Sequence, residues 1–198
     1  MKAVASWRLF VTDARRRAFT LIEMVIVLVV VGVLLALGLP RLDMSRFRAD
    51  AVAQLVRSTI QTAQRSALTR QHDVLVSFDT AAGKMRIVWD ANNDGRVTEG
   101  ERVQWASLET GNAFAGPARG LDGSAAPAIT GSALRTLDDL PTLTLHRNGT
   151  SSSAVDIYIG CAAQGAARAF RAVRLTQSTG RTEWFRQGEG GAWIAATL

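Results

Sequence analysis

An uninterrupted apolar segment near the N-terminus limits what this chain can fold into more than any other feature. Residues 24–39 read MVIVLVVVGVLLALGL and contain no charged side chain. Together with residues 19–22 they form an apolar stretch of about 20 residues, which is enough to span a bilayer as a helix. Arg15, Arg16 and Arg17 stand directly before it, and basic flanks stay on the cytoplasmic side. The pattern predicts a single-pass membrane protein whose larger part lies across the membrane.

The order of the N-terminal features differs from that of a secretory signal. A signal peptide carries its small cleavage-site residue after the apolar core, whereas Ala18 precedes the core. Cleavage between Ala18 and Phe19 would therefore leave the apolar helix on the mature protein. The formal charge of +6 is concentrated before that bond, with five basic residues against one acid, so removal of residues 1–18 leaves +2. That residual charge is too small for a general polyanion-binding surface.

Glu23 is the one acid close to the apolar run. A carboxylate at such a position costs roughly 2–3 kcal/mol on insertion scales, which indicates a functional role. A cationic partner would offset this cost, and cleavage before Phe19 would create one as a new α-amino group. We expect Glu23 of one subunit to neutralise that amine on its neighbour in a stack of helices.

The segment RRRAFTLIE, residues 15–23, resembles the processing site of type IV prepilins and type II secretion pseudopilins. In that family a membrane aspartyl peptidase cuts before the aromatic residue and then N-methylates it. The resemblance implies that the Ala18–Phe19 bond is cut, that Phe19 becomes the methylated terminus and that Glu23 directs assembly. Ala18 replaces the usual glycine, and Pro40 falls where the helix of the family usually bends.

The rest of the chain predicts an α+β fold. Apolar residues recur at helical spacing over residues 47–67, and the period changes to two from about Asp73. We therefore expect a leader over residues 1–18, a transmembrane and assembly helix over 19–40, its amphipathic outer half over 41–72, and a periplasmic antiparallel β domain over 73–198. Residues 110–133 are expected to form a long loop. The helix residues expected to face the sheet are Phe47, Ala51, Val52, Leu55, Val56, Ile60, Ala63 and Ala67; the expected strands are 74–78, 85–89, 102–105, 142–146, 155–159, 170–176 and 182–185.

This pilin-like arrangement is similar to that of the GspH/FimT group of minor pseudopilins and minor pilins. The likeness is carried by the hairpin Asp90–Glu101, the segment LTLHRNG at residues 143–149, and a final strand pair turning at Ser178–Arg181. It implies assembly with other pilins or pseudopilins, processing by the prepilin peptidase, and contact with the inner-membrane assembly platform and with lipid.

The hairpin segment DANNDGRVTEGE, residues 90–101, is the best candidate metal site. Asp90, Asn92, Asp94 and Glu101 reproduce the oxygen-ligand spacing of a calcium-binding EF-hand loop, with Gly95 at the sharp turn. The flanking segments have the pattern of strands rather than helices. Two interpretations stay open: a structural calcium ion, with no cofactor otherwise required, or a polar turn built on residues 93–95.

Hydrolytic machinery is not visible in the sequence. His72 and His146 lie far apart, and the single cysteine, Cys161, has no catalytic signature around it and is expected to be a small buried residue. Asp138 and Asp139 are expected to solvate a turn. We therefore predict that the protein is not an enzyme.

The sequence also argues against nucleic acid as a partner. Some FimT-like minor pilins take part in DNA uptake, and Arg181 lies in the Gly-Arg turn where their basic residues occur. In this chain Glu183 follows where a second basic residue stands in those relatives.

The sequence leaves two similar functions open. One is a minor pseudopilin resembling the H subunit of type II secretion; the other is a FimT- or FimU-like minor pilin of a type IV pilus. A membrane-anchored, calcium-dependent binding module is a third and more distant alternative.

Overall fold

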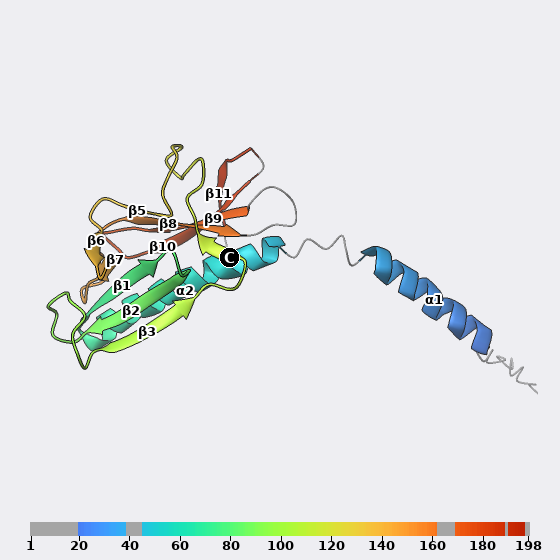
Figure 1. Ribbon diagram of the computed structural model, residues 1–198, viewed down its shortest axis with the longest axis horizontal. Helices are drawn as coiled ribbons and strands as arrows, with labels where there is room; N and C mark the ends of the chain where they lie inside the picture. Colours follow the sequence, from blue (N-terminus) through green and yellow to red (C-terminus); the bar gives the residue numbers. More distant parts are fainter. Residues whose placement is uncertain (1–19, 39–44, 162–168, 189, 197–198) are drawn as a thin grey trace, which may run out of the picture. The chain divides into compact units, whose positions relative to one another are not determined.

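The computed structural model describes residues 20–38, 45–161, 169–188 and 190–196 (Figure 1). The chain divides into two compact units, Met1–Leu42 and Asp43–Leu198. The first contains α1 (Leu21–Gly38), an 18-residue helix that is about 27 Å long at 1.5 Å per residue. In the part of the chain that the structure describes, no helix has both the length and the hydropathy needed to cross a membrane. Residues 39–44, including Pro40, lie outside the described residues, and so does the predicted bend.

The second unit is built from one helix and two antiparallel sheets. Among the described residues, the first sheet has the strand order β3-β2-β1-β7-β6. Val76 of β1 lies opposite Ile87 of β2 on one side and Leu143 of β7 on the other. The strands are β1 (Asp73–Asp79), β2 (Lys84–Asp90), β3 (Arg102–Ser107), β6 (Arg135–Leu137) and β7 (Leu140–Leu145).

The second sheet has the order β11-β10-β9-β8-β4, and β5 also pairs with β8. Its longest ladder joins β8 to β9, where Ile157 lies opposite Val173. The strands are β4 (Asn112–Phe114), β5 (Ile129–Gly131), β8 (Val155–Cys161), β9 (Ala169–Leu175), β10 (Thr182–Gln187) and β11 (Trp193–Ala195).

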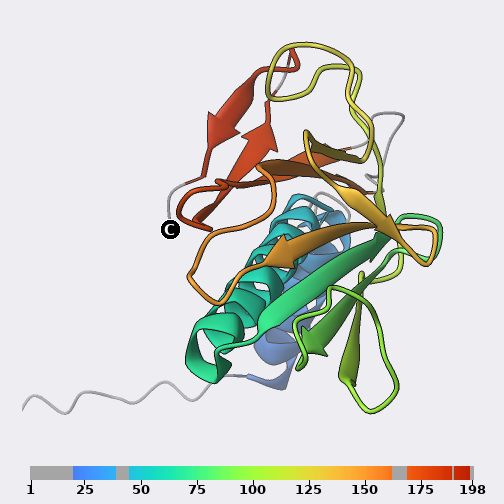
Figure 2. The same cartoon turned by 90° about the vertical axis from the view of Figure 1, so that its left-hand side faces the viewer.

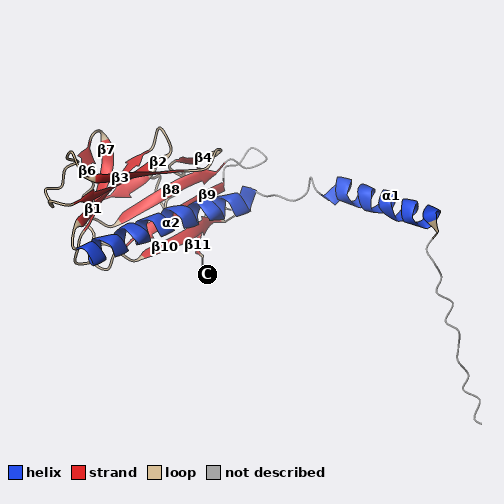
Figure 3. Cartoon of the chain, turned by 90° about the horizontal axis from the view of Figure 1, so that it is seen from below, coloured by secondary structure: helices blue, strands red, loops and turns tan. Residues whose placement is uncertain are grey.

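Helix α2 (Ser45–Arg70) packs against strands of both sheets, chiefly β9, β10, β1 and β8. Figure 2 shows it flanked by the green strands of one sheet and the orange and red strands of the other, and Figure 3 shows it running along the strands. The core that it closes contains Ile60, Phe78 and Leu143, all fully buried. Every residue of this core belongs to the second unit.

The amphipathic helix was predicted correctly, but its buried stripe is rotated from the predicted one. The buried residues are Ala49, Val52, Ala53, Val56, Ile60, Ala63 and Ala67. Phe47 is 72% exposed, and Ala51 and Leu55 also lie on the exposed side. Four of these buried residues are alanines, whereas the bulky Phe47 and Leu55 remain outside.

All seven predicted strands are confirmed, as is the α+β class. The predicted long loop at residues 110–133 contains two short strands, β4 and β5, which pair with β8. Strands of three residues are too short to show a period of two, so the sequence pattern missed them, together with β6 and β11.

Candidate functional site

The first turn of α1 combines a capping residue with an acid. The backbone N–H of Glu23 donates to Oγ1 of Thr20 at 3.3 Å and to the carbonyl of Thr20 at 3.1 Å. A threonine at the N-cap followed three residues later by glutamate is the favourable start of a helix, and the positive end of the helix dipole favours a carboxylate there. Glu23 therefore occupies the third position after the helix cap, a placement that the sequence analysis missed although the T-x-x-E spacing signals it.

The surface of α1 is apolar on every side. Leu21, Leu28 and Leu34 are 83%, 70% and 64% exposed, and the remaining large apolar residues as far as Leu35 are also exposed. A helix that is apolar all round is normally buried in protein or in lipid. Among the described residues, the Glu23 carboxylate is exposed and has no ion-pair partner. The helix thus presents both an unpaired acid and a large uncovered apolar surface.

The predicted cleavage and methylation residues, Ala18 and Phe19, lie outside the described residues, so these assignments stay predictions. The same holds for the role assigned to Pro40.

The four predicted calcium ligands are Asp90, at the end of β2, and three residues of the loop between β2 and β3, and their side chains bond to groups of this same segment. Asp90 is buried, and its two carboxylate oxygens accept the N–H groups of Asp94 at 3.1 Å and of Gly95 at 2.7 Å. The two oxygens of Glu101 accept the N–H groups of Ala91 at 3.2 Å and of Thr98 at 3.0 Å. The side chains therefore act as caps of a polar turn.

The side chains of Asn92 and Asp94 are also engaged within the loop. Asn92 donates from Nδ2 to Asp94 at 2.9 Å, and Oδ1 of Asp94 accepts the N–H of Arg96 at 2.7 Å. Burial raises the pKa of Asp90, and the neighbouring carboxylates of Glu101 and Asp94 raise it further, whereas the two amide hydrogen bonds lower it. Across the described residues, no three His, Cys, Asp or Glu side chains gather closely enough to hold a metal ion. This geometry supports the turn interpretation, and calcium binding stays a prediction.

The C-terminal arginines that the structure describes are each paired with an acid. Arg174 forms a bidentate pair with Asp156, with bonds of 2.7 and 2.8 Å that raise the pKa of the guanidinium. Arg171 and Arg186 both contact Asp50 of α2. Arg181 is exposed and lies 3.3 Å from Glu183. Glu183, which stands where the DNA-binding relatives have a second basic residue, is thus the partner of Arg181.

The residues considered for catalysis occupy separate, structural positions. His146 contacts Asp73 through Nδ1 at 2.9 Å, at the end of β7. Asp138 and Asp139 have φ of 50° and 60° and form the two-residue turn between β6 and β7, and Asp138 also accepts a hydrogen bond from Arg86 at 2.7 Å. Cys161 is buried, as expected.

Comparison with known proteins bears on the N-terminal region first. Residues 13–39 match the family described as the prokaryotic N-terminal methylation motif, and this span contains Ala18, Phe19, Glu23 and most of α1. A pilin-like protein, PilA1 of Thermus thermophilus, is 34% identical over 98 residues. The start of the chain therefore carries a prepilin-type N-terminal methylation motif. The alignment with PilA1 covers 49% of this chain and 63% of the length of PilA1, which is less than two thirds.

Two solved structures of the minor pseudopilin EpsH from the type 2 secretion system of Vibrio cholerae also resemble the chain. They are 10% and 12% identical to it, with TM-scores of 0.38 and 0.40. Each alignment covers 75% of this chain and 96% or 95% of EpsH.

Proposed function

We propose that this prepilin-like protein is a minor pseudopilin, resembling the H subunit of type II secretion, and that it assembles into a periplasmic pseudopilus through α1. The observation that carries the proposal is the combination of a processing motif over residues 13–39 with a helix that is exposed and apolar on every side. Burying this surface against other pilin helices or in lipid is strongly favourable, because each large apolar side chain contributes about 1.5–3 kcal/mol.

In this proposal the precursor enters the inner membrane with residues 1–18 in the cytoplasm. The prepilin peptidase cuts before Phe19 and methylates it, and the second unit lies in the periplasm. Glu23 then pairs with the new terminal amine of a neighbouring subunit. The exposure of its carboxylate supports this role, because among the described residues it has no ion-pair partner within the chain. The protein acts as a structural subunit, without a cofactor and without chemistry of its own.

The second candidate is a FimT- or FimU-like minor pilin of a type IV pilus. It uses the same processing, the same helix and the same acid. The pilin-like relative in Thermus favours keeping this candidate. DNA uptake through Arg181 is less favoured, because the ion pair with Glu183 neutralises that guanidinium.

A deletion strain complemented with wild type or with Glu23→Ala tests the proposal. We expect the deletion to abolish exoprotein secretion and leave surface pili intact, and Glu23→Ala to fail to restore secretion although the protein reaches the membrane. Loss of pili with intact secretion would instead support the minor pilin. Full rescue of both activities by Glu23→Ala would contradict the role given to the carboxylate.

A further inference from the structure

Phe47, in the first turn of α2, is the most exposed large apolar residue among the described residues of the second unit. It is 72% exposed, compared with 61% for Ile194 and 48% for Trp105. Ala49 and Val52, on the other side of the helix, are buried in the core. Folding of the second unit therefore leaves the phenyl ring of Phe47 without apolar cover.

The charged groups beside Phe47 leave a positive charge next to the ring. Arg48 is exposed and, among the described residues, forms no ion pair. The nearest described acid along the helix, Asp50, is already paired with Arg171 and Arg186. Helices that lie on a lipid surface combine an apolar ring, which enters the boundary of acyl chains and headgroups, with a basic side chain at headgroup level.

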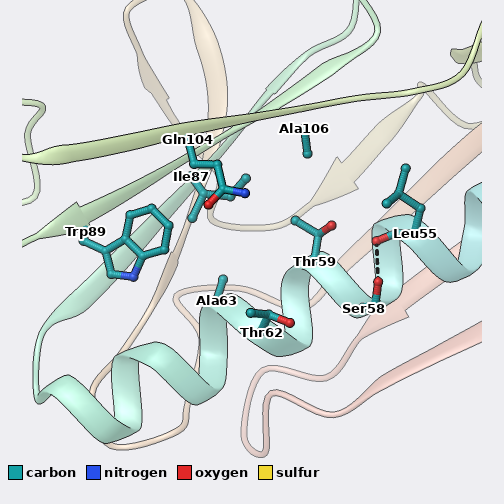
Figure 4. A pocket seen from close by; sticks show the side chains of 9 residues that line it. All are labelled: Leu55, Ser58, Thr59, Thr62, Ala63, Ile87, Trp89, Gln104 and Ala106. Atoms are coloured by element: carbon teal, nitrogen blue, oxygen red, sulfur yellow. Dashed lines mark hydrogen bonds between the residues drawn. The ribbon is translucent and has the colours of Figure 1, made fainter.

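The side of α2 that carries Phe47 stays uncharged beyond this turn. Ala51, one turn further along, is exposed. Leu55 and Thr59 then border an open groove of about 240 Å³ between α2 and β3, and every residue that lines this groove is uncharged (Figure 4). The groove therefore supplies no acid that would neutralise Arg48.

The chain between the two helices is short enough to keep this turn close to a bilayer that holds α1. The length of α1, about 27 Å, is close to the hydrocarbon thickness of about 30 Å. Only residues 39–44 separate Gly38 from Ser45, and seven peptide steps extend over at most about 25 Å. The first turn of α2 is therefore within reach of the headgroup layer at which α1 ends.

We propose that Phe47 and Arg48 form an interfacial anchor, through which the second unit contacts the bilayer before the subunit enters a fibre. The partner is lipid: the phenyl ring enters the upper part of the acyl layer, and the guanidinium binds phosphate oxygens of the headgroups. Release of this anchor accompanies extraction of α1 from the membrane. The inference rests on the proposed function, because it requires α1 to be inserted.

Depth measurements on the full-length chain in vesicles of phosphatidylethanolamine and phosphatidylglycerol test the anchor. A fluorophore is attached to Ala51→Cys or to Leu68→Cys, and its quenching by nitroxide on the lipid headgroups is measured. Leu68 is the far control on the same helix, since it is 42% exposed and lies about 26 Å further along the axis. Both variants keep Phe47 and Arg48, and the wild-type chain controls for reaction at Cys161. We expect strong quenching of the label at position 51 and weak quenching at position 68.

Substitutions in the Ala51→Cys background identify the groups that bind lipid. Phe47→Ser should lower the ratio of docked to free second units about tenfold, because the apolar ring is lost. Ile194→Ser is the matched control, since it removes another exposed apolar residue of the same unit and should leave the ratio unchanged. Arg48→Gln should lower the ratio about fivefold on this anionic surface.

Equal quenching at positions 51 and 68, or quenching that Phe47→Ser leaves unchanged, would overturn the anchor. Weak quenching at position 51 with energy transfer between labelled chains would show that a second copy covers this surface, which would also overturn it. If the chain meanwhile stays with the vesicles in alkaline carbonate, these failures leave the proposed function intact. Loss of the chain from the vesicles in that wash would contradict the insertion of α1, and with it both proposals.

Discussion

The carboxylate of Asp50 accepts a hydrogen bond from Nε of Arg171 at 2.6 Å. The guanidinium of Arg171 is 5% exposed and comes from β9, whereas Asp50 belongs to the second turn of α2. The other oxygen of the same carboxylate lies 2.9 Å from Arg186 of β10. One acid therefore ties the N-terminal part of α2 to two neighbouring strands of the second sheet.

Replacing Asp50 with alanine should be strongly destabilising. It leaves a buried guanidinium without this carboxylate, and breaking a buried ion pair costs about 3–5 kcal/mol. Arg186→Ala is the control, because its side chain is 51% exposed and surface pairs contribute about 0–1 kcal/mol. Urea unfolding of residues 43–198, the unit that contains the whole core, measures both free energies. If Asp50→Ala and Arg186→Ala lowered the free energy of unfolding equally, the buried Asp50–Arg171 pair would not be the more stabilising contact.

Gly180 should tolerate alanine poorly. Its φ is +59°, and an added Cβ would lie 1.9 Å from Nε2 of Gln64, which donates to the carbonyls of Gly149 and Thr179. Gly123→Ala is the matched control, since Gly123 also has a positive φ but open space around it. We expect Gly123→Ala to cost about 1–2 kcal/mol from backbone strain and Gly180→Ala to cost more, by displacing Gln64. Equal midpoints of urea unfolding for Gly180→Ala and Gly123→Ala would show that the position of Gln64 beside Gly180 does not contribute to stability.

The thiol of Cys161 should be inert in the folded protein. Burial raises its pKa from 9.0 to about 11, so the thiolate population at pH 8 is about a hundredfold lower than in the unfolded chain. We expect a thiol reagent to label Cys161 in urea and not in buffer. The folded chain holds this proton more tightly than the unfolded chain, so the contribution to stability is complete below pH 9 and is lost as the pH rises toward 11. Rapid labelling of the native protein at pH 8 would contradict this account.

Calcium should leave the stability of the β2–β3 loop unchanged. The oxygens of Asp90 and Glu101 already accept backbone N–H groups, which cap the turn without a metal. Melting temperatures of residues 43–198 in millimolar calcium and in chelator should therefore agree. An increase with calcium that Asp90→Asn removes and Glu99→Gln retains would support the metal site that the ligand spacing predicts.

The sequence predicted those features that depend on long, regular patterns. Alternation over β1, β2 and β8 and the helical spacing over α2 were each sufficient to locate an element. The three-residue strands have no such pattern, since they exist through pairing with β8, β7 or β10. The buried Asp50–Arg171 pair could not be predicted from the sequence either. Its two residues are 121 positions apart, and the alternation of β9 does not show which acid an arginine contacts. At the candidate site, Glu23 was recognised from its apolar surroundings, whereas its place three residues after the cap Thr20 was missed although the T-x-x-E spacing signals it.

Mass spectrometry of the N-terminus of the membrane-associated protein tests the central claim most directly. If the chain is processed as a prepilin, the mature protein begins at a methylated Phe19 and retains the whole of α1, and a strain without the prepilin peptidase accumulates the form with residues 1–18. A mature protein that keeps residues 1–18 in the presence of the peptidase, or one that is cut after the apolar segment, would contradict the account.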